Sequence, residues 1–242
     1  MPSELSPHRL LRRVQAIVAV LGVVALVVAL APGLSDLRDA IAGARPGWIA
    51  LAVVLEFLSG VSYVVMFRPL FCDRMSWRTG WEMGWSELGM GSIVPASGAG
   101  GLALGAWLLR EQGMPAEHIA RRSVAFFLLK SSVNFVAVAV IGAAMALGVG
   151  PHQSLWLTAF PAALAVLAIA AVVAVPRLGP GSDPGPGASR MRRAIAGARR
   201  ALIGGVGEAI AVARARDVSV IAGSFGYWAF DNAVLWATFH AV

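Results

Sequence analysis

Residues 123–147 read SVAFFLLKSSVNFVAVAVIGAAMAL, and this stretch decides the fold class of the chain. It contains one charged residue, Lys130, and it is longer than the roughly 20 residues with which an α-helix crosses about 30 Å of hydrocarbon. Four further apolar runs occupy residues 14–31, 48–67, 155–175 and 218–242. The sequence therefore predicts an all-α fold, a polytopic transmembrane helix bundle, rather than a soluble or secreted domain.

The composition also separates the chain from soluble proteins. Of its 242 residues 58% are apolar and 14% charged, whereas soluble domains have about 45–50% apolar and about 25% charged residues. The net charge of +7 comes from arginines between the apolar runs, whereas nucleic-acid binding would require a basic stripe on a soluble face. The single cysteine, Cys72, excludes an intrachain disulfide. Residues 14–31 resemble a signal peptide but exceed its usual apolar core, so we interpret them as an uncleaved first helix.

The segment at residues 81–109 is apolar but is broken by PASGAGG at residues 95–101. The parts before and after the break are each too short to cross a bilayer, so the segment is either one kinked span or a re-entrant hairpin. A hairpin leaves 17 basic residues on the cytoplasmic side and two, Arg38 and Arg45, outside; a kinked span would put the eight arginines of residues 176–217 outside. The positive-inside rule favours the hairpin, with a cytoplasmic N-terminus in the cell inner (plasma) membrane.

Residues 176–217 form a predicted cytoplasmic region between a bundle at residues 1–175 and a last transmembrane helix at residues 218–242. The region begins with PRLGPGSDPGPGAS, which has the composition of a flexible linker. Apolar residues then recur at helical spacing, with arginines on another face; the apolar positions are Met191, Ile195, Ala198 and Leu202. This pattern predicts a basic amphipathic helix, which lies either in the anionic membrane interface or as a solvated helix packed on the bundle.

The break at residues 95–101 is the first candidate binding feature. Its proline removes a backbone donor and its glycines permit unusual dihedrals, so we expect these residues to be non-helical at membrane depth. Such backbone is tolerated where it lines a cavity, and the helix that follows would direct free N–H groups at an anionic phosphate. Alternatively, the pairs Gly101 with Gly105 and Gly80 with Gly84 are GxxxG contacts that allow close helix packing.

Lys130 is the second candidate, because an ammonium roughly 10 Å below the membrane boundary is costly unless it faces the bundle interior. Asn134 lies one turn further on the same face, and Glu56 and Glu87 are predicted to hold the lysine when no lipid is bound. We expect Lys130 and the break to face one polar cavity, although a structural ion pair would also explain the lysine. The predicted headgroup and cavity residues are Pro95, Ser97, Gly98, Gly100, Gly101, Lys130, Asn134, Glu56, Glu87 and Asp231.

Motifs of enzymes are not recognisable in the sequence. The four histidines are scattered, and the HExxH, GxSxG and P-loop patterns do not occur. We therefore expect no enzymatic activity, no cofactor and no metal site.

The chain resembles the transmembrane region of the lysylphosphatidylglycerol synthase family, also described as flippase-like membrane proteins. The resemblance extends from about residue 11 to the end and rests on GSIVPASGAGG at residues 91–101, Leu108-Leu109-Arg110, the turn Gly113-Met114-Pro115, and Arg121 with Arg122. It implies a polytopic inner-membrane bundle that in some members moves aminoacylated or glycosylated lipids between leaflets. The soluble aminoacyl-transfer domain of full synthases has no counterpart here. Members commonly have a second Pro/Gly break after the last apolar run, so we expect the chain to be truncated after residue 242.

These observations predict a protein that recognises or translocates a (phospho)lipid between leaflets, with membrane lipids of anionic headgroup as its partners. The alternative is a non-transporting membrane subunit that scaffolds or regulates a cell-envelope lipid enzyme. A membrane-embedded lipid-modifying enzyme is a third hypothesis, which would require product formation by the purified protein.

Overall fold

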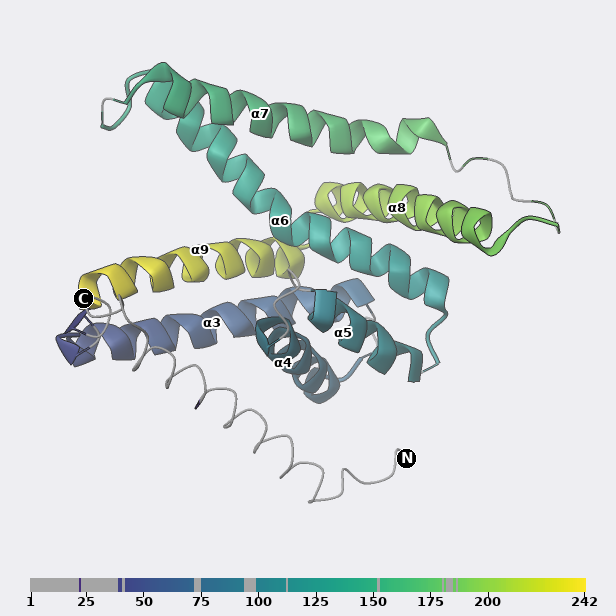
Figure 1. Cartoon of the computed structure of the whole chain (residues 1–242), viewed down its shortest axis with the longest axis horizontal. Helices are drawn as coiled ribbons and strands as arrows, with labels where there is room; N and C mark the ends of the chain where they lie inside the picture. The colour runs from purple at the N-terminus through teal and green to yellow at the C-terminus, as the bar shows by residue number, and fades with distance from the viewer. Residues whose placement is uncertain are drawn as a thin grey trace. The chain divides into compact units, whose positions relative to one another are not determined.

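The computed structural model describes residues 22, 39–40, 42–71, 75–93, 99–111, 113–151, 153–179, 181, 185 and 187–242. The described elements are helices, and no strand occurs among them, as the sequence predicts (Figure 1). They are α3 (Pro46–Phe71), α4 (Trp77–Ile93), α5 (Ala99–Glu111), α6 (Ala116–Ala146), α7 (Leu155–Ala174), the 3₁₀ turn η1 (Val175–Leu178), α8 (Arg190–Ala215) and α9 (Val218–Ala241). The predicted first span, apart from residue 22, lies outside the described residues.

Three of the described helical segments are long and apolar enough to cross a membrane: Pro46–Phe71, Ala116–Ala146 and Leu155–Leu178. They confirm the runs predicted at residues 48–67, 123–147 and 155–175. Helix α9 forms where the last run was predicted and has 24 residues. It does not reach the same apolarity because Asp231 and Asn232 interrupt it, so its crossing of the membrane stays a prediction.

The chain divides into two compact units, which are Met1–Ala52 with Leu235–Val242, and Val53–Val234. In the first unit, the backbone N–H of Arg45 donates to the carbonyl of Ala241 at 2.8 Å. The Trp48 ring packs against Trp236 and His240, with 5.0 Å between the centroids in each pair. Aromatic side chains gathered at helix ends are typical of a membrane–water interface.

In the second unit, α3 supplies the largest share of the core. Tyr63, Phe67 and Phe71 recur every four residues, so they share one helix face, and all three are buried. Phe126 of α6 packs edge-on against Tyr63 and Phe67, with centroids 5.0 and 5.7 Å away. Helix α6 also packs against α5, α7 and α8, so it is the element around which this unit is organised (Figure 1).

The broken segment forms two short helices, α4 and α5, which pack against each other. They have 17 and 13 residues, so each is shorter than a full crossing, in agreement with the predicted break. The prediction that residues 95–101 are non-helical is wrong for its last three residues, because α5 begins at Ala99. The first four lie outside the described residues, and whether the segment re-enters on the same side stays a prediction. Gly100 and Gly101 are compatible with this helix because they lie in its first turn, where the backbone N–H groups have no partner within the helix.

Helix α8 forms where the basic amphipathic helix was predicted, and the hydroxyl of Ser189 caps it by accepting from the N–H of Arg192. Its second half packs on α6, where Glu208 forms ion pairs with Arg121 and Arg122. Its first half is exposed, including the apolar side chains of Met191 and Ile195. The helix is therefore confirmed, whereas its placement in the membrane interface stays a prediction.

Candidate functional site

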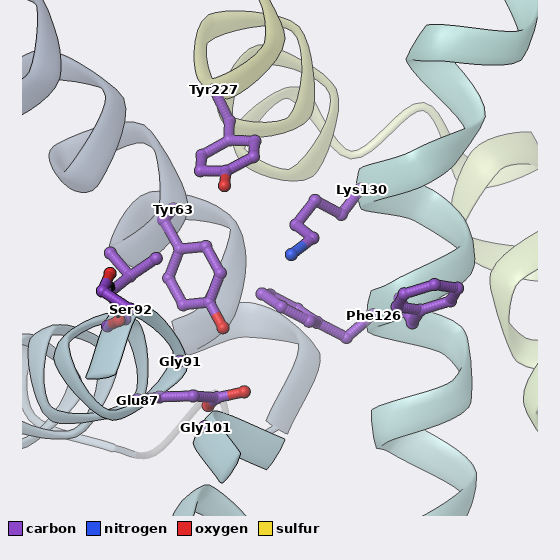
Figure 2. Close-up of a pocket in the computed structure, with 10 residues that line it drawn as sticks. Tyr63, Glu87, Gly91, Ser92, Gly101, Phe126, Lys130 and Tyr227 are labelled. Carbon is purple, nitrogen blue, oxygen red and sulfur yellow. Dashed lines mark hydrogen bonds between the residues drawn. The ribbon is translucent and has the colours of Figure 1, made fainter. Parts of the chain in front are cut away.

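Five helices of the second unit meet around a cavity of about 240 Å³, which we call the lysine cavity (Figure 2). Helices α3, α4, α5, α6 and α9 each contribute to it. Its walls are Tyr63, Glu87, Leu88, Gly91, Ser92, Gly101, Phe126, Phe127, Lys130 and Tyr227. The cavity thus brings together two predicted features, Lys130 and the start of the helix that follows the break.

Lys130 directs its ammonium into this cavity, between two tyrosine rings (Figure 2). The Nζ atom lies 5.5 Å from the ring centroid of Tyr63 and 5.3 Å from that of Tyr227, within the range of cation–π attraction. Glu87 and Asp231 also attract it electrostatically. Among the described residues it forms no direct ion pair, since the ion pairs found there all involve arginine. Its three N–H donors are therefore available to a ligand.

Glu87 is a charged residue of α4 that is only 4% exposed. The hydroxyl of Tyr63 points toward its carboxylate (Figure 2). Gly101 and Gly105 of α5 make room for the residue, because an added Cβ at Gly105 would lie 2.7 Å from Glu87 Oε2, and one at Gly101 2.5 Å from its carbonyl oxygen. The two glycines therefore leave room for a buried carboxylate. The predicted GxxxG contact of Gly101 with Gly105 is thus a contact with Glu87 of α4.

A second cavity of about 450 Å³ adjoins the first, and we call it the aspartate cavity. It is lined by Glu56, Ser59, Gly60, Trp85, Leu88, Gly89, Ser92, Tyr227 and Asp231. The hydroxyl of Ser59 donates to Asp231 Oδ1 at 2.5 Å, and Tyr227 lines the same cavity. Leu88, Ser92 and Tyr227 border both cavities, so Tyr227 stands between the lysine and Asp231.

The structure brings most of the described candidate residues together and separates two of them from Lys130. Gly101, Glu87 and Lys130 share the lysine cavity, and Asp231 lies in the adjoining one. Glu56, predicted to hold the lysine, instead lines the aspartate cavity; Glu87 and Asp231 act on Lys130.

Asn134 was expected on the same face as Lys130 but lines a different cavity, with Trp228 and Asn232 of α9. Gly100 belongs to the first turn of α5. The remaining candidates, Pro95, Ser97 and Gly98, lie outside the described residues.

Sequence reasoning missed both tyrosines. Tyr63 and Tyr227 are the only tyrosines of the chain, each lies within an apolar run, and each borders the lysine cavity. A buried hydroxyl in an apolar run usually needs a polar partner, and this feature of the sequence could have indicated that the tyrosines belong to the site. Ser59, the donor to Asp231, carried the same signal and is 2% exposed.

The apolar helices, the broken segment and the charged interior cavity together define an integral membrane protein of the helix-bundle class. The family described as lysylphosphatidylglycerol synthase TM region matches residues 16–242, and the chain belongs to this family. No curated protein and no solved structure matches the chain significantly.

Proposed function

We propose that this protein binds the phosphate of an anionic membrane lipid at Lys130 and passes the lipid between leaflets. The position of Lys130 within a predicted transmembrane run is the single observation that supports this proposal most strongly. It is the only lysine of the chain, whereas the 19 arginines lie outside the predicted transmembrane runs. An intramembrane charge is costly and usually functional.

The geometry around Lys130 suits a phosphate. An ammonium is a compact charge with three rotatable donors, which matches the oxygens of a phosphodiester. The tyrosine rings hold it at 5.5 and 5.3 Å without consuming those donors. Phe126, which is 1% exposed, lines the cavity on the α6 side, and an apolar wall of this kind strengthens the attraction between opposite charges.

The start of α5 is the second element that supports phosphate binding. Gly101 belongs to its first turn and lines the lysine cavity. The free N–H groups and positive dipole end of a helix N-terminus favour an anion. Lys130 and this helix end would therefore act on the same ligand from two sides.

The location and orientation are part of the same proposal. We infer a multi-pass protein of the cell inner membrane with a cytoplasmic N-terminus, because the basic segments would then face the cytoplasm. Arg121 and Arg122, held by Glu208 of α8, would lie at that side. We propose a binding and transport role without chemical conversion of the lipid.

A leaflet-resolved assay in proteoliposomes tests the proposal. Phosphatidylcholine vesicles would carry a trace of phosphatidylglycerol labelled on an acyl chain, and a membrane-impermeant quencher would report the labelled lipid in the outer leaflet. We expect exchange with the wild type, a loss of about tenfold or more in Lys130→Ala, and no loss in Ser132→Ala, an exposed residue of the same helix.

Labelled diacylglycerol, which lacks the phosphate, separates headgroup recognition from general leakage. If the protein accelerates the flipping of labelled phosphatidylglycerol and labelled diacylglycerol to the same extent, headgroup recognition is contradicted. Phosphatidylglycerol binding without exchange would support the alternative, a non-transporting subunit that scaffolds or regulates a lipid enzyme. Unchanged exchange in Lys130→Ala would remove the lysine from the site.

A further inference from the structure

The two adjoining cavities contain more negative than positive formal charge. Glu87 and Asp231 flank Lys130, and Glu56 lines the aspartate cavity beside Asp231. Among the described residues that line the two cavities, Lys130 is the one basic side chain. Lys130 can compensate one of the two carboxylates that flank it, which leaves an excess negative charge at a partly buried position.

An anionic lipid headgroup would increase this imbalance. A phosphodiester brings one further negative charge, and binding it draws Lys130 away from the carboxylates that the lysine compensates in the empty cavity. A carboxylate that loses its counter-charge in a low-dielectric site is strongly destabilised and tends to take up a proton. Headgroup binding at Lys130 is therefore electrostatically compatible with these carboxylates only if a positive charge enters with the lipid.

Glu87 is the carboxylate best placed to receive that positive charge as a proton. Asp231 accepts a hydrogen bond from Ser59 at 2.5 Å and is half-buried. Glu87 is more deeply buried, at 4% exposed, and burial makes a charge costly. The proton is therefore expected on Glu87 rather than on Asp231.

Every element that faces Glu87 and Lys130 enters this charge balance. Helix α3 presents Tyr63 and Glu56, α4 presents Glu87, and α6 presents Lys130. Helix α9 presents Tyr227 and Asp231, whereas α5 contributes glycine to the lysine cavity and no titratable side chain. Among the described residues that line the two cavities, the carboxylates and Lys130 are therefore the groups that carry formal charge.

We propose that binding of the anionic headgroup is coupled to uptake of one proton by Glu87, so that lipid exchange is a proton-linked process. The proton comes from water and forms an O–H bond on the Glu87 carboxylate. The phosphate adds one negative charge and the proton one positive charge, so the net charge of the cavities does not change. Release of the lipid reverses both steps. This inference rests on the proposed function and specifies how the same site is regulated.

The dependence of exchange on pH tests the coupling. The assay with labelled phosphatidylglycerol would be run from about pH 5 to about pH 8, a range in which an unperturbed carboxylate stays ionised. Wild-type exchange should fall as the pH rises, by up to about tenfold per pH unit above the midpoint, because the protonated fraction of one group falls by that factor. Glu87→Gln mimics the protonated residue, so its exchange should stay near the low-pH level throughout.

Two further variants locate the proton. Tyr63→Phe removes the hydroxyl that points toward Glu87 and could donate to its charged form, so the pH midpoint of exchange should move to higher pH. Ser132→Ala, a change at an exposed residue of α6 that lines neither cavity, should keep the midpoint and slope of the wild type. A pH-sensitive dye inside the vesicles should report proton movement together with lipid exchange in the wild type and none in Glu87→Gln.

The outcomes separate the two proposals. Exchange in the wild type that does not change with pH, or a Glu87→Gln protein with the wild-type slope, would overturn the coupling and leave lipid transport intact. Absence of exchange at every pH would instead contradict the proposed function. If Glu87→Gln does not insert, the midpoint shift in Tyr63→Phe decides, and a midpoint equal to that of the wild type overturns the assignment to Glu87.

Discussion

The rings of Tyr63 and Tyr227 lie 5.8 Å apart between centroids, and the ammonium of Lys130 faces both. The tyrosines come from α3 and α9, two helices far apart in the chain, and the lysine comes from α6. The hydroxyl of Tyr63 points toward Glu87, and Tyr227 lines the aspartate cavity together with Asp231. Each tyrosine therefore connects the lysine to one carboxylate, and each ring can be tested separately from its hydroxyl.

The ring of Tyr227 should matter for Lys130 more than its hydroxyl. Tyr227→Phe keeps the aromatic face, whereas Tyr227→Leu removes a cation–π contact of about 0.5–2 kcal/mol. We expect Tyr227→Leu to lower the midpoint of thermal unfolding in detergent more than Tyr227→Phe does. We also expect faster reaction of Lys130, the only lysine, with an amine-selective reagent in the leucine variant. Equal reactivity in both variants would show that the ring does not hold the ammonium.

Gly105→Ala should disturb the position of Glu87. The new Cβ would lie 2.7 Å from Oε2 of Glu87, which is closer than real Cβ atoms come, and 3.1 Å from its Cδ, which is tighter than most real contacts. Overpacking of this kind costs about 1–3 kcal/mol, so we expect a lower unfolding midpoint together with reduced lipid exchange. Gly207→Ala is the matched control, because nothing lies within 4 Å of a Cβ at this helical glycine. The control should be neutral or stabilising by up to about 1 kcal/mol.

Glu208 should stabilise the contact between α8 and α6. It pairs with both Arg121 and Arg122, and Arg122 Nε lies 3.2 Å from Oε2. Glu208→Ala leaves two partly buried guanidinium groups without their carboxylate, which we expect to cost about 1–2 kcal/mol, between the values for exposed and buried pairs. Thermal unfolding in detergent measures the loss, and Arg214→Ala, an exposed residue of the same helix, is the control.

The proposed topology places Glu117, at the start of α6, on the cytoplasmic side. A cysteine introduced there in a Cys72→Ser background should react with an impermeant thiol reagent only after the cell membrane is opened, because residues 81–109 would enter and leave on that side. A cysteine at Ser154, between α6 and α7, should react in intact cells. Labelling of position 117 in intact cells would make the segment at residues 81–109 a full crossing.

The sequence by itself determined that this is a helical membrane protein. Long apolar runs are local signals, because the cost of lipid-exposed polar groups acts on each segment separately, and the spans at α3, α6 and α7 were therefore predictable. The basic amphipathic helix was predictable for the same reason, since its pattern repeats within α8. Lys130 could be identified from the sequence as a candidate site residue, because the cost of its charge in the membrane does not depend on its neighbours.

Only the tertiary structure decided which residues surround Lys130. Asn134 lies one turn away on α6, yet it faces Trp228 and Asn232 of α9, because the helices that pack beside α6 change along its length. The local glycines predicted that the chain is non-helical through Gly101. In the structure α5 already begins at Ala99, and Gly101 packs closely against Glu87 as part of this helix. The partners of the lysine, Tyr63 and Tyr227, lie on α3 and α9, and no local pattern encodes such long-range contacts. The membrane class follows from the chemistry of single segments, whereas the candidate site follows from how separate segments pack.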